Sequence, residues 1–402
     1  AGFLLCLDLL YMASAPMTEP LAIMWAVLVV YGLFHFQQSG RARTLAASAV
    51  AAFFGTLTRY DGWYLLPFAV LFVLFCRRRP WKRRAGETLL FSLIAGCGPV
   101  LWLAHNAYRY HNPLAFYNGP HSAKAIYAHQ LATTGFRYPT EGSLWLSAHY
   151  YLEDVRLVLG PWALILASLG LLVWLMDRQN RRRRSATLLL LVPLPFYIQA
   201  MAFASIPIYV PTLFPHTYYN LRYGLEMAPA VAVLLSFLVP RRVPVRVRTV
   251  VLGILLAVLA GQWTGIAAAG AKKIPVVTEA VLNTPWKSPA VQDASRYLRA
   301  HYDGTRLLMA DGEWACVMSQ LGIRYRNALT PANRSYWRKL RWGASRLVGW
   351  IVVERGDAVN ELMRADPGAF SNFALVDSEP LPHGSYLRIY QALRKGATSV
   401  AP

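Results

Sequence analysis

Leu57-Thr58-Arg59-Tyr60-Asp61-Gly62-Trp63-Tyr64-Leu65-Leu66-Pro67 carries an arginine and an aspartate between two apolar runs. The run 45–57 enters this stretch and the run 63–76 leaves it. Charges between two segments that enter a bilayer are costly, so they commonly face a polar cavity or the membrane surface. Two interpretations stay open for Arg59 and Asp61: a functional site, or a tight Asp-Gly turn whose arginine reaches the lipid headgroups.

Composition indicates an integral membrane protein. The 402 residues are 55% hydrophobic and only 15% charged, whereas soluble domains are about 25% charged. The net charge of +21 would also suit nucleic acid, but many basic residues lie in short clusters between apolar runs, as the positive-inside rule requires. Four cysteines show no CxxC spacing, so we expect neither a disulfide framework nor a zinc site. No motif in the chain predicts a cofactor, and we expect none.

Apolar runs predict nine membrane segments, the first of them partial because Ala1 already lies inside a run. The runs cover residues 1–12, 20–36, 44–57, 63–76, 88–106, 158–176, 186–206, 223–239 and 250–269. One set of alternate loops carries 17 Lys and Arg and the opposite set carries 6, which predicts the first set in the cytoplasm. We therefore expect the loop 107–157 and the tail on the extracytoplasmic side of a bacterial-type plasma membrane.

The predicted fold class is mainly α: a polytopic transmembrane helix bundle over residues 1–270, followed by a small extracytoplasmic α/β domain over 271–402. In the tail, helices are predicted at 288–300, 313–321, 335–342 and 357–364, and strands at 305–310, 348–353, 373–376 and 386–390. Four basic residues of the tail are expected to face solvent or lipid headgroups rather than nucleic acid. They are Arg334, Arg338, Lys339 and Arg341.

Two further stretches open apolar runs from the predicted outer side. Glu19 lies in Met17-Thr18-Glu19-Pro20, where an acid complements a helix N-terminus or, alternatively, positions an acceptor hydroxyl at the mouth of a cavity. Arg222 precedes Tyr223, where a guanidinium suits a phosphate or serves as an anchor in the headgroup region.

The long outer loop is rich in aromatics, amides and histidines, which are the side chains that sugar sites use. Its central part contains Tyr117, Asn118 and His121. Packing of aromatics at the membrane interface is the alternative for its tyrosines. The histidines are spaced too irregularly for a convincing metal site.

Taken together, these stretches resemble the C-type glycosyltransferase (GT-C) superfamily, in the style of protein O-mannosyltransferases and lipid A aminoarabinose transferases. The matching residues are Met17-Thr18-Glu19-Pro20-Leu21, Leu57-Thr58-Arg59-Tyr60-Asp61-Gly62, Asn112-Pro113-Leu114-Ala115-Phe116-Tyr117-Asn118-Gly119-Pro120, and Arg222-Tyr223 leading to Pro229. The resemblance covers residues 1–269, and it implies an enzyme that moves a sugar from a polyprenyl-phosphate carrier to an extracytoplasmic glycan, lipid or protein.

The resemblance also implies roles for particular residues. Members of the superfamily typically place one acid in the first outer loop and another in the second; Glu19 matches the second, and the first is expected upstream of Ala1. The candidates for the carrier phosphate are Arg59, Arg222 and Tyr223, and those for the sugar or acceptor are Asp61, Tyr117, Asn118 and His121. A carboxylate would orient or deprotonate the acceptor while cationic groups stabilise the departing phosphate. Arg59→Ala and Arg222→Ala are then predicted to weaken carrier use and leave the fold intact.

Three other functions fit parts of the sequence. A non-catalytic transporter, flippase or binding protein for lipid-linked sugars would place polar residues along the middle of its helices, whereas this chain concentrates them at the outer ends. An oligosaccharyltransferase-like enzyme would share the carrier but require a metal and a peptide groove. A tail that binds cell-wall polymer would need only a simple anchor, for which nine segments are more than enough.

Overall fold

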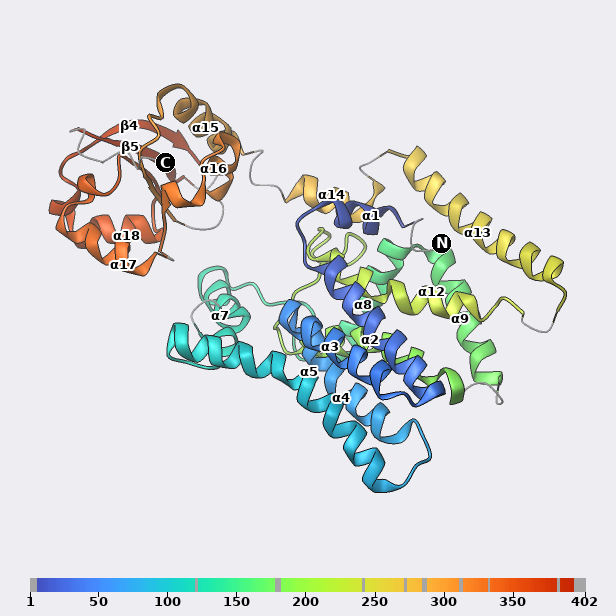
Figure 1. Cartoon of the computed structure of the whole chain (residues 1–402). Helices are drawn as coiled ribbons and strands as arrows, with labels where there is room; N and C mark the ends of the chain where they lie inside the picture. Colours follow the sequence, from blue (N-terminus) through green and yellow to red (C-terminus); the bar gives the residue numbers. More distant parts are fainter. Residues whose placement is uncertain are drawn as a thin grey trace. The chain divides into compact units, whose positions relative to one another are not determined.

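The computed structural model divides the chain into two compact units, Ala1–Leu282 and Asn283–Pro402 (Figure 1). The structure describes residues 6–119, 122–177, 182–240, 243–270, 273–283, 288–310, 314–331, 333–381 and 384–393. The chain is mainly helical and has one small sheet, which lies in the second unit.

The first unit is built from helices of very different lengths. The longer ones are α2 (Glu19–Ser39), α3 (Ala42–Thr58), α4 (Tyr60–Phe75), α5 (Trp81–Tyr110), α8 (Leu144–Leu159), α9 (Pro161–Met176) and α13 (Val245–Ala268). The shorter ones are α1 (Leu7–Ser14), α6 (Ala115–Asn118), α7 (Ala123–Thr134), η2 (Arg182–Leu191), α11 (Pro193–Ala202), η3 (Leu221–Met227), α12 (Ala228–Ser236) and α14 (Pro275–Leu282).

The membrane character of the chain is supported by helix length and hydropathy. Among the described residues, α2, α5, α13 and the segment Ser185–Ala202 are long and apolar enough to cross a bilayer, and α8 with α9 would make a fifth span. The apolar surfaces of α5 and α13 are largely exposed, since only 17% and 11% of their most apolar windows are buried. Exposed apolar faces of this size suit lipid contact.

These helices give four or five candidate spans, fewer than the nine segments expected from the sequence. Two of the expected apolar runs are not single straight helices. The run 158–176 is broken at Gly160, which has a φ of 84° and precedes Pro161, so α8 and α9 meet at a bend of 111°. The run 223–239 is divided between the 3₁₀ helix η3 and α12, which has only 9 residues. Pro229 lies in the first turn of α12, where its missing N–H costs least.

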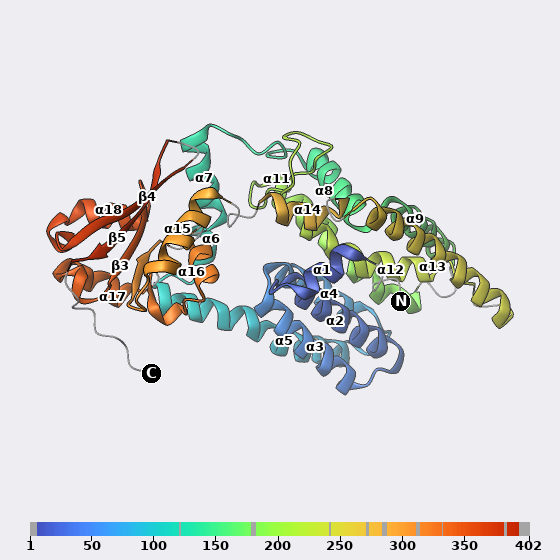
Figure 2. The same ribbon diagram turned by 90° about the horizontal axis from the view of Figure 1, so that it is seen from above.

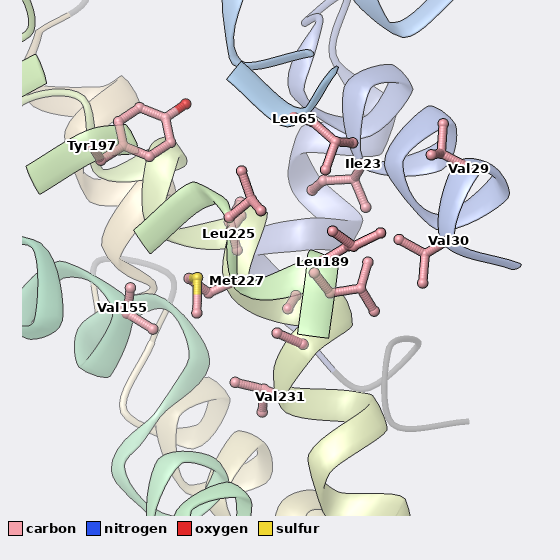
Figure 3. Close-up of a cluster of buried hydrophobic side chains, with 14 of the residues drawn as sticks. Ile23, Val29, Val30, Leu65, Val155, Leu189, Tyr197, Leu225, Met227 and Val231 are labelled. Atoms are coloured by element: carbon pink, nitrogen blue, oxygen red, sulfur yellow. The ribbon is translucent and has the colours of Figure 1, made fainter. Parts of the chain in front are cut away.

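The core of the first unit lies where α2, α4, α8, α11, η2, η3 and α12 converge. Figure 3 shows Ile23 beside Leu65, with Leu189 and Leu225 nearby and Val231 farther away in the same cluster. Small residues let helices approach closely: a Cβ on Gly170 of α9 would lie 2.0 Å from the carbonyl oxygen of Leu234 in α12. This close approach fixes how α9 and α12 cross.

The second unit is a three-layer α/β/α domain (Figure 2). Its strands are β1 (Leu307–Met309), β2 (Ala328–Leu329), β3 (Trp350–Glu354), β4 (Phe373–Pro380) and β5 (Tyr386–Ala392), in the order β2-β1-β3-β5-β4. β2, β1 and β3 are parallel, and β5 is antiparallel to both β3 and β4. α15 (Pro289–His301) and α16 (Ala315–Leu321) cover one face, while α18 (Ala358–Ala365) and η7 (Leu340–Trp342), which follows α17 (Arg334–Lys339), cover the other.

The elements predicted for the tail are confirmed. All four predicted helices and all four predicted strands are present, with ends shifted by a few residues. One strand and one α-helix were not predicted: β2, which has only 2 residues, and α14, which lies in the predicted tail domain 271–402 but belongs to the first unit. A strand of two residues is too short to show an alternating apolar pattern in the sequence, so β2 is recognised only by its pairing with β1.

Candidate functional site

The site is built around the single residue that joins α3 to α4. Arg59 is extended, with φ −155° and ψ 158°, so α3 ends at Thr58 and α4 begins at Tyr60. Gly62 allows this tight junction, because a Cβ there would lie 2.7 Å from the carbonyl oxygen of Gly55. Asp61 lies in the first turn of α4, where a carboxylate complements the helix dipole.

The guanidinium of Arg59 holds three carboxylates together. Its Nη1 donates to Glu19 Oε1 at 2.9 Å, and its Nε donates to Asp61 Oδ2 at 3.1 Å and lies 3.4 Å from Glu226 Oε1. Its Nη2 donates to the hydroxyl of Tyr197 at 3.1 Å, and that hydroxyl donates to Glu226 Oε1 at 2.7 Å. Nη1 also donates to Thr18 Oγ1 at 3.2 Å, so four of the five N–H donors of Arg59 are occupied.

Glu19 links Arg59 to the second arginine. Arg222 Nε donates to the same Glu19 Oε1 at 2.7 Å, across 203 residues of sequence. The ring of Tyr223 lies beside both guanidiniums, with Arg59 Cζ 5.0 Å and Arg222 Cζ 4.8 Å from the ring centroid. These distances fit cation–π contacts. Together with Asp61, the structure thus brings together five residues that the sequence singled out from three separate stretches.

The second oxygen of Glu19 differs from the first. The residue is only 1% exposed, and its Oε2 accepts no hydrogen bond from the residues that the structure describes. A buried carboxylate oxygen without a donor is costly. It is also the atom to which a bound hydroxyl could donate.

Glu279 on α14 completes the network from the far end of the first unit. Its two oxygens accept the backbone N–H groups of Asn220 and Leu221 at 2.7 and 2.8 Å, and Arg222 Nη1 lies 3.9 Å from Oε1. Asn220 has a φ of 62° and immediately precedes η3, whose Arg222 bonds to Glu19. Burial raises the pKa of the Glu279 carboxyl, although the two N–H groups and Arg222 partly oppose the rise.

We call these eight residues the arginine–carboxylate network: Glu19, Arg59, Asp61, Tyr197, Arg222, Tyr223, Glu226 and Glu279. Its four carboxylates outnumber its two guanidiniums, so full ionisation would leave the network negative. An incoming phosphate would therefore be accompanied by a proton or would displace a carboxylate from an arginine. Arg222 is the better placed of the two arginines for such an exchange, because its side chain is 26% exposed and that of Arg59 is 16% exposed.

An apolar cavity adjoins the network. It lies between α2, α3, α4, η2, α11, η3 and α12 and is partly open: about 660 Å³ of space, which includes open solvent, lies among its lining residues, and about 50 Å³ of it forms the cavity itself. Asp61 and Glu226 are the charged residues of its lining, which otherwise consists of side chains such as Ile23, Trp25 and Phe196. The cavity thus offers an apolar volume that ends at a cluster of charges.

The candidates in the loop 107–157 are not part of the network. Tyr117 is 61% exposed, and Asn118 Oδ1 accepts a hydrogen bond from Asn112 Nδ2 at 2.7 Å within its own loop. His121 lies outside the described residues. The loop approaches the site through Phe116 instead, whose ring stacks on Tyr60 with centroids 4.9 Å apart.

Three members of the network were missed as site residues by sequence reasoning. Tyr197 and Glu226 lie inside apolar runs, and a charge within an apolar run is a signal that would have found Glu226. Glu279 is likewise the one charge of a mostly apolar helix, but α14 has only 8 residues, too few to count as an apolar run of membrane length. Within the described ranges, no group of three His, Cys, Asp or Glu side chains is placed to hold a metal ion.

Comparison with known proteins assigns the chain to no family: no protein-family model and no curated protein matches it. Function is therefore inferred from the residues themselves.

Proposed function

We propose that this chain belongs to an integral membrane glycosyltransferase, which moves a sugar from a polyprenyl-phosphate carrier to an acceptor hydroxyl on the extracytoplasmic side. The observation that carries the proposal is Glu19: two arginines from separate segments hold its Oε1, while its buried Oε2 has no donor among the described residues. A carboxylate held in this way is suited to orient an acceptor hydroxyl and accept its proton.

The proposed step is a single displacement. The acceptor O–H donates to Glu19 Oε2, its oxygen forms a bond with the anomeric carbon of the sugar, and the proton passes to the carboxylate. The bond between the anomeric carbon and the carrier phosphate breaks, and the phosphate oxygen leaves with the electron pair. Arg222, the more exposed of the two arginines, stabilises the departing phosphate, and Arg59 positions the carboxylates.

The apolar cavity supports the choice of a lipid-linked donor. An apolar volume beside a charged network suits a ligand with a hydrocarbon part and an ionic head. The same feature also favours a second candidate, a non-catalytic transporter or binding protein for lipid-linked sugars. In that case Glu19 would contribute to binding, and no bond would be broken.

Substitution of Glu19 tests the proposal and separates the two candidates. With the full-length protein in proteoliposomes, Glu19→Gln should lower sugar transfer from a polyprenyl-phosphate donor by about 10²- to 10⁴-fold, which is the range for loss of a general base. Crosslinking to a photoreactive polyprenyl phosphate should be preserved. The matched control is Glu153→Gln, which removes a carboxylate paired with Arg156 on α8 and should transfer sugar at the parent rate.

Transfer at the parent rate by Glu19→Gln would disprove the catalytic role of the carboxylate. Crosslinking without any transfer by the parent protein, across a panel of acceptors, would favour the transporter or binding protein.

A further inference from the structure

The second unit carries a strongly basic surface that the proposed function does not use. Between Glu313 and Glu354 the sequence contains seven Lys and Arg and no acidic residue. Six of these basic side chains are described by the structure, and all six are exposed. We call them the basic face: Arg324, Arg326, Arg338, Lys339, Arg341 and Arg346.

The parallel strands gather these residues at one end of the sheet. Leu307, Ala328 and Trp350 pair in register at the start of β1, β2 and β3. Arg326 lies just before β2 and Arg346 just before β3, so both lie at the amino ends of the parallel strands.

Arg306 joins α17 to the same end of the sheet. It immediately precedes β1, its carbonyl oxygen accepts the N–H of Gly349 at 2.9 Å, and its guanidinium lies 5.3 Å from the ring centroid of Tyr336 on α17. Lys339 lies over the same ring at 5.5 Å. The basic residues before β2, on α17 and before β3 therefore come from segments that meet at the same end of the sheet, where the parallel strands begin.

The charges of the basic face are not neutralised within the protein. Its residues form no ion pair with any acid in the ranges that the structure describes. Two large aromatic rings are exposed among them, since Tyr325 is 73% and Trp342 is 80% exposed. Tyrosine and tryptophan with basic residues are typical of surfaces that lie in the headgroup region of a bilayer.

We propose that the basic face binds the anionic phospholipid headgroups of the bilayer that holds the apolar helices. A soluble polyanion without rings, such as polyglutamate, would be attracted by the same charges but would leave Trp342 and Tyr325 in water. A bilayer accepts both the charges and the rings.

The connection between the two units favours the same partner. Six residues, 283–288, separate the end of α14 from the start of α15. Even fully extended, they span about 25 Å. This short tether raises the effective concentration of the second unit at a bilayer that holds the first, so weak contacts are enough.

The test uses the full-length protein in nanodiscs made with and without phosphatidylglycerol. The four native cysteines are replaced, and Ser335→Cys on α17, which is exposed, carries a fluorophore that lipids with a nitroxide headgroup can quench. We expect strong quenching only in the anionic nanodiscs, and less of it at high salt, because the Debye length falls from about 8 Å at physiological salt to about 3 Å at 1 M.

Matched charge reversals locate the contact. Arg338→Glu with Arg341→Glu should reduce quenching to its value in neutral nanodiscs, because each basic residue near an anionic surface contributes about a fivefold factor to binding. The control pair is Arg355→Glu with Arg388→Glu, which reverses two exposed charges beside the opposite end of β3 and should leave the quenching unchanged. Hydrogen exchange of β3 checks that both pairs stay folded.

Three outcomes would overturn the proposal: equal quenching in neutral and anionic nanodiscs, an equal effect of the two charge-reversal pairs, or binding of soluble polyglutamate or RNA by the basic face without quenching by lipid. The last result would assign the surface to a soluble polyanion. These outcomes do not depend on sugar transfer, so the inference stands or fails separately from the proposed function.

Discussion

At Arg59, one guanidinium bonds to Glu19 and Asp61 and lies 3.4 Å from Glu226. A buried charge is tolerated when it is paired, and removal of one partner leaves the others uncompensated. Arg59 therefore stabilises the carboxylates, while Arg222, with a more exposed side chain and fewer bonds, remains available to a ligand. The two arginines that the sequence treated alike have different surroundings.

This difference predicts different effects of the two alanine variants. Arg59→Ala should lower the free energy of unfolding by about 3–5 kcal/mol, the typical loss for a broken buried ion pair. Arg222→Ala should change the stability little and raise the KM for a polyprenyl-phosphate donor. Thermal unfolding in nanodiscs and donor titration would measure the two effects.

Arg222→Lys serves as the control for charge, because lysine keeps the charge without the planar fork of donors. A large loss of stability in Arg222→Ala, or none in Arg59→Ala, would contradict this division of roles. The sequence alone favoured an intact fold for both variants, because it does not show how many carboxylates surround each arginine.

Two helices of the first unit pack closely at a glycine, where a larger side chain would not fit. α9 and α12 approach so closely at Gly170 that even a methyl group would collide with the carbonyl oxygen of Leu234. Gly96 on α5 has open space instead, because a Cβ added there would meet no atom of the described residues within 4 Å. Two glycines in apolar helices thus have opposite packing roles.

Alanine at these two positions should have effects of opposite sign. Gly170→Ala should destabilise the first unit by about 1–3 kcal/mol or more, because α9 and α12 must separate. Gly96→Ala should be neutral or stabilise by up to about 1 kcal/mol, since alanine is the better helix former. Thermal unfolding of both variants in the same detergent measures the difference, and equal shifts would show that the α9–α12 crossing is not set by Gly170.

At the level of the whole molecule, each unit has its own hydrophobic core. The first is centred on residues such as Leu33, and the second on residues such as Leu298 and Trp350. Since these cores share no residue, each unit contains the interactions that stabilise it.

A core truncation in one unit should therefore leave the other unit protected. Leu298→Ala, at a site that is 0% exposed, should cost about 2–5 kcal/mol and speed hydrogen exchange in α15, β1 and β3 only. Leu33→Ala, also 0% exposed, is the matched change in the first unit and should speed exchange in α2 and α3. Equal loss of protection across both units would show a single cooperative structure.

The sequence by itself determined the properties that depend on near neighbours in the chain. Hydropathy over windows of about 20 residues predicts apolar helices of membrane length, of which four or five of the nine predicted are long and apolar enough among the described residues. The spacing of apolar residues predicted most helices and the main strands of the tail. Local signals also marked Glu19, Arg59, Asp61, Arg222 and Tyr223 as candidates, each from a charge or aromatic ring beside an apolar run.

Only the tertiary structure decided how those candidates combine. Glu19 and Arg222 are 203 residues apart and share a hydrogen bond, Tyr197 enters from an apolar run, and Glu279 holds η3 from a helix near the end of the unit. A local pattern carries no information on such pairs, because their distances are set by the packing of helices far apart in the chain. The same packing left Glu19 Oε2 buried with no donor from the part of the chain that the structure describes, and that atom is the basis of the proposed chemistry.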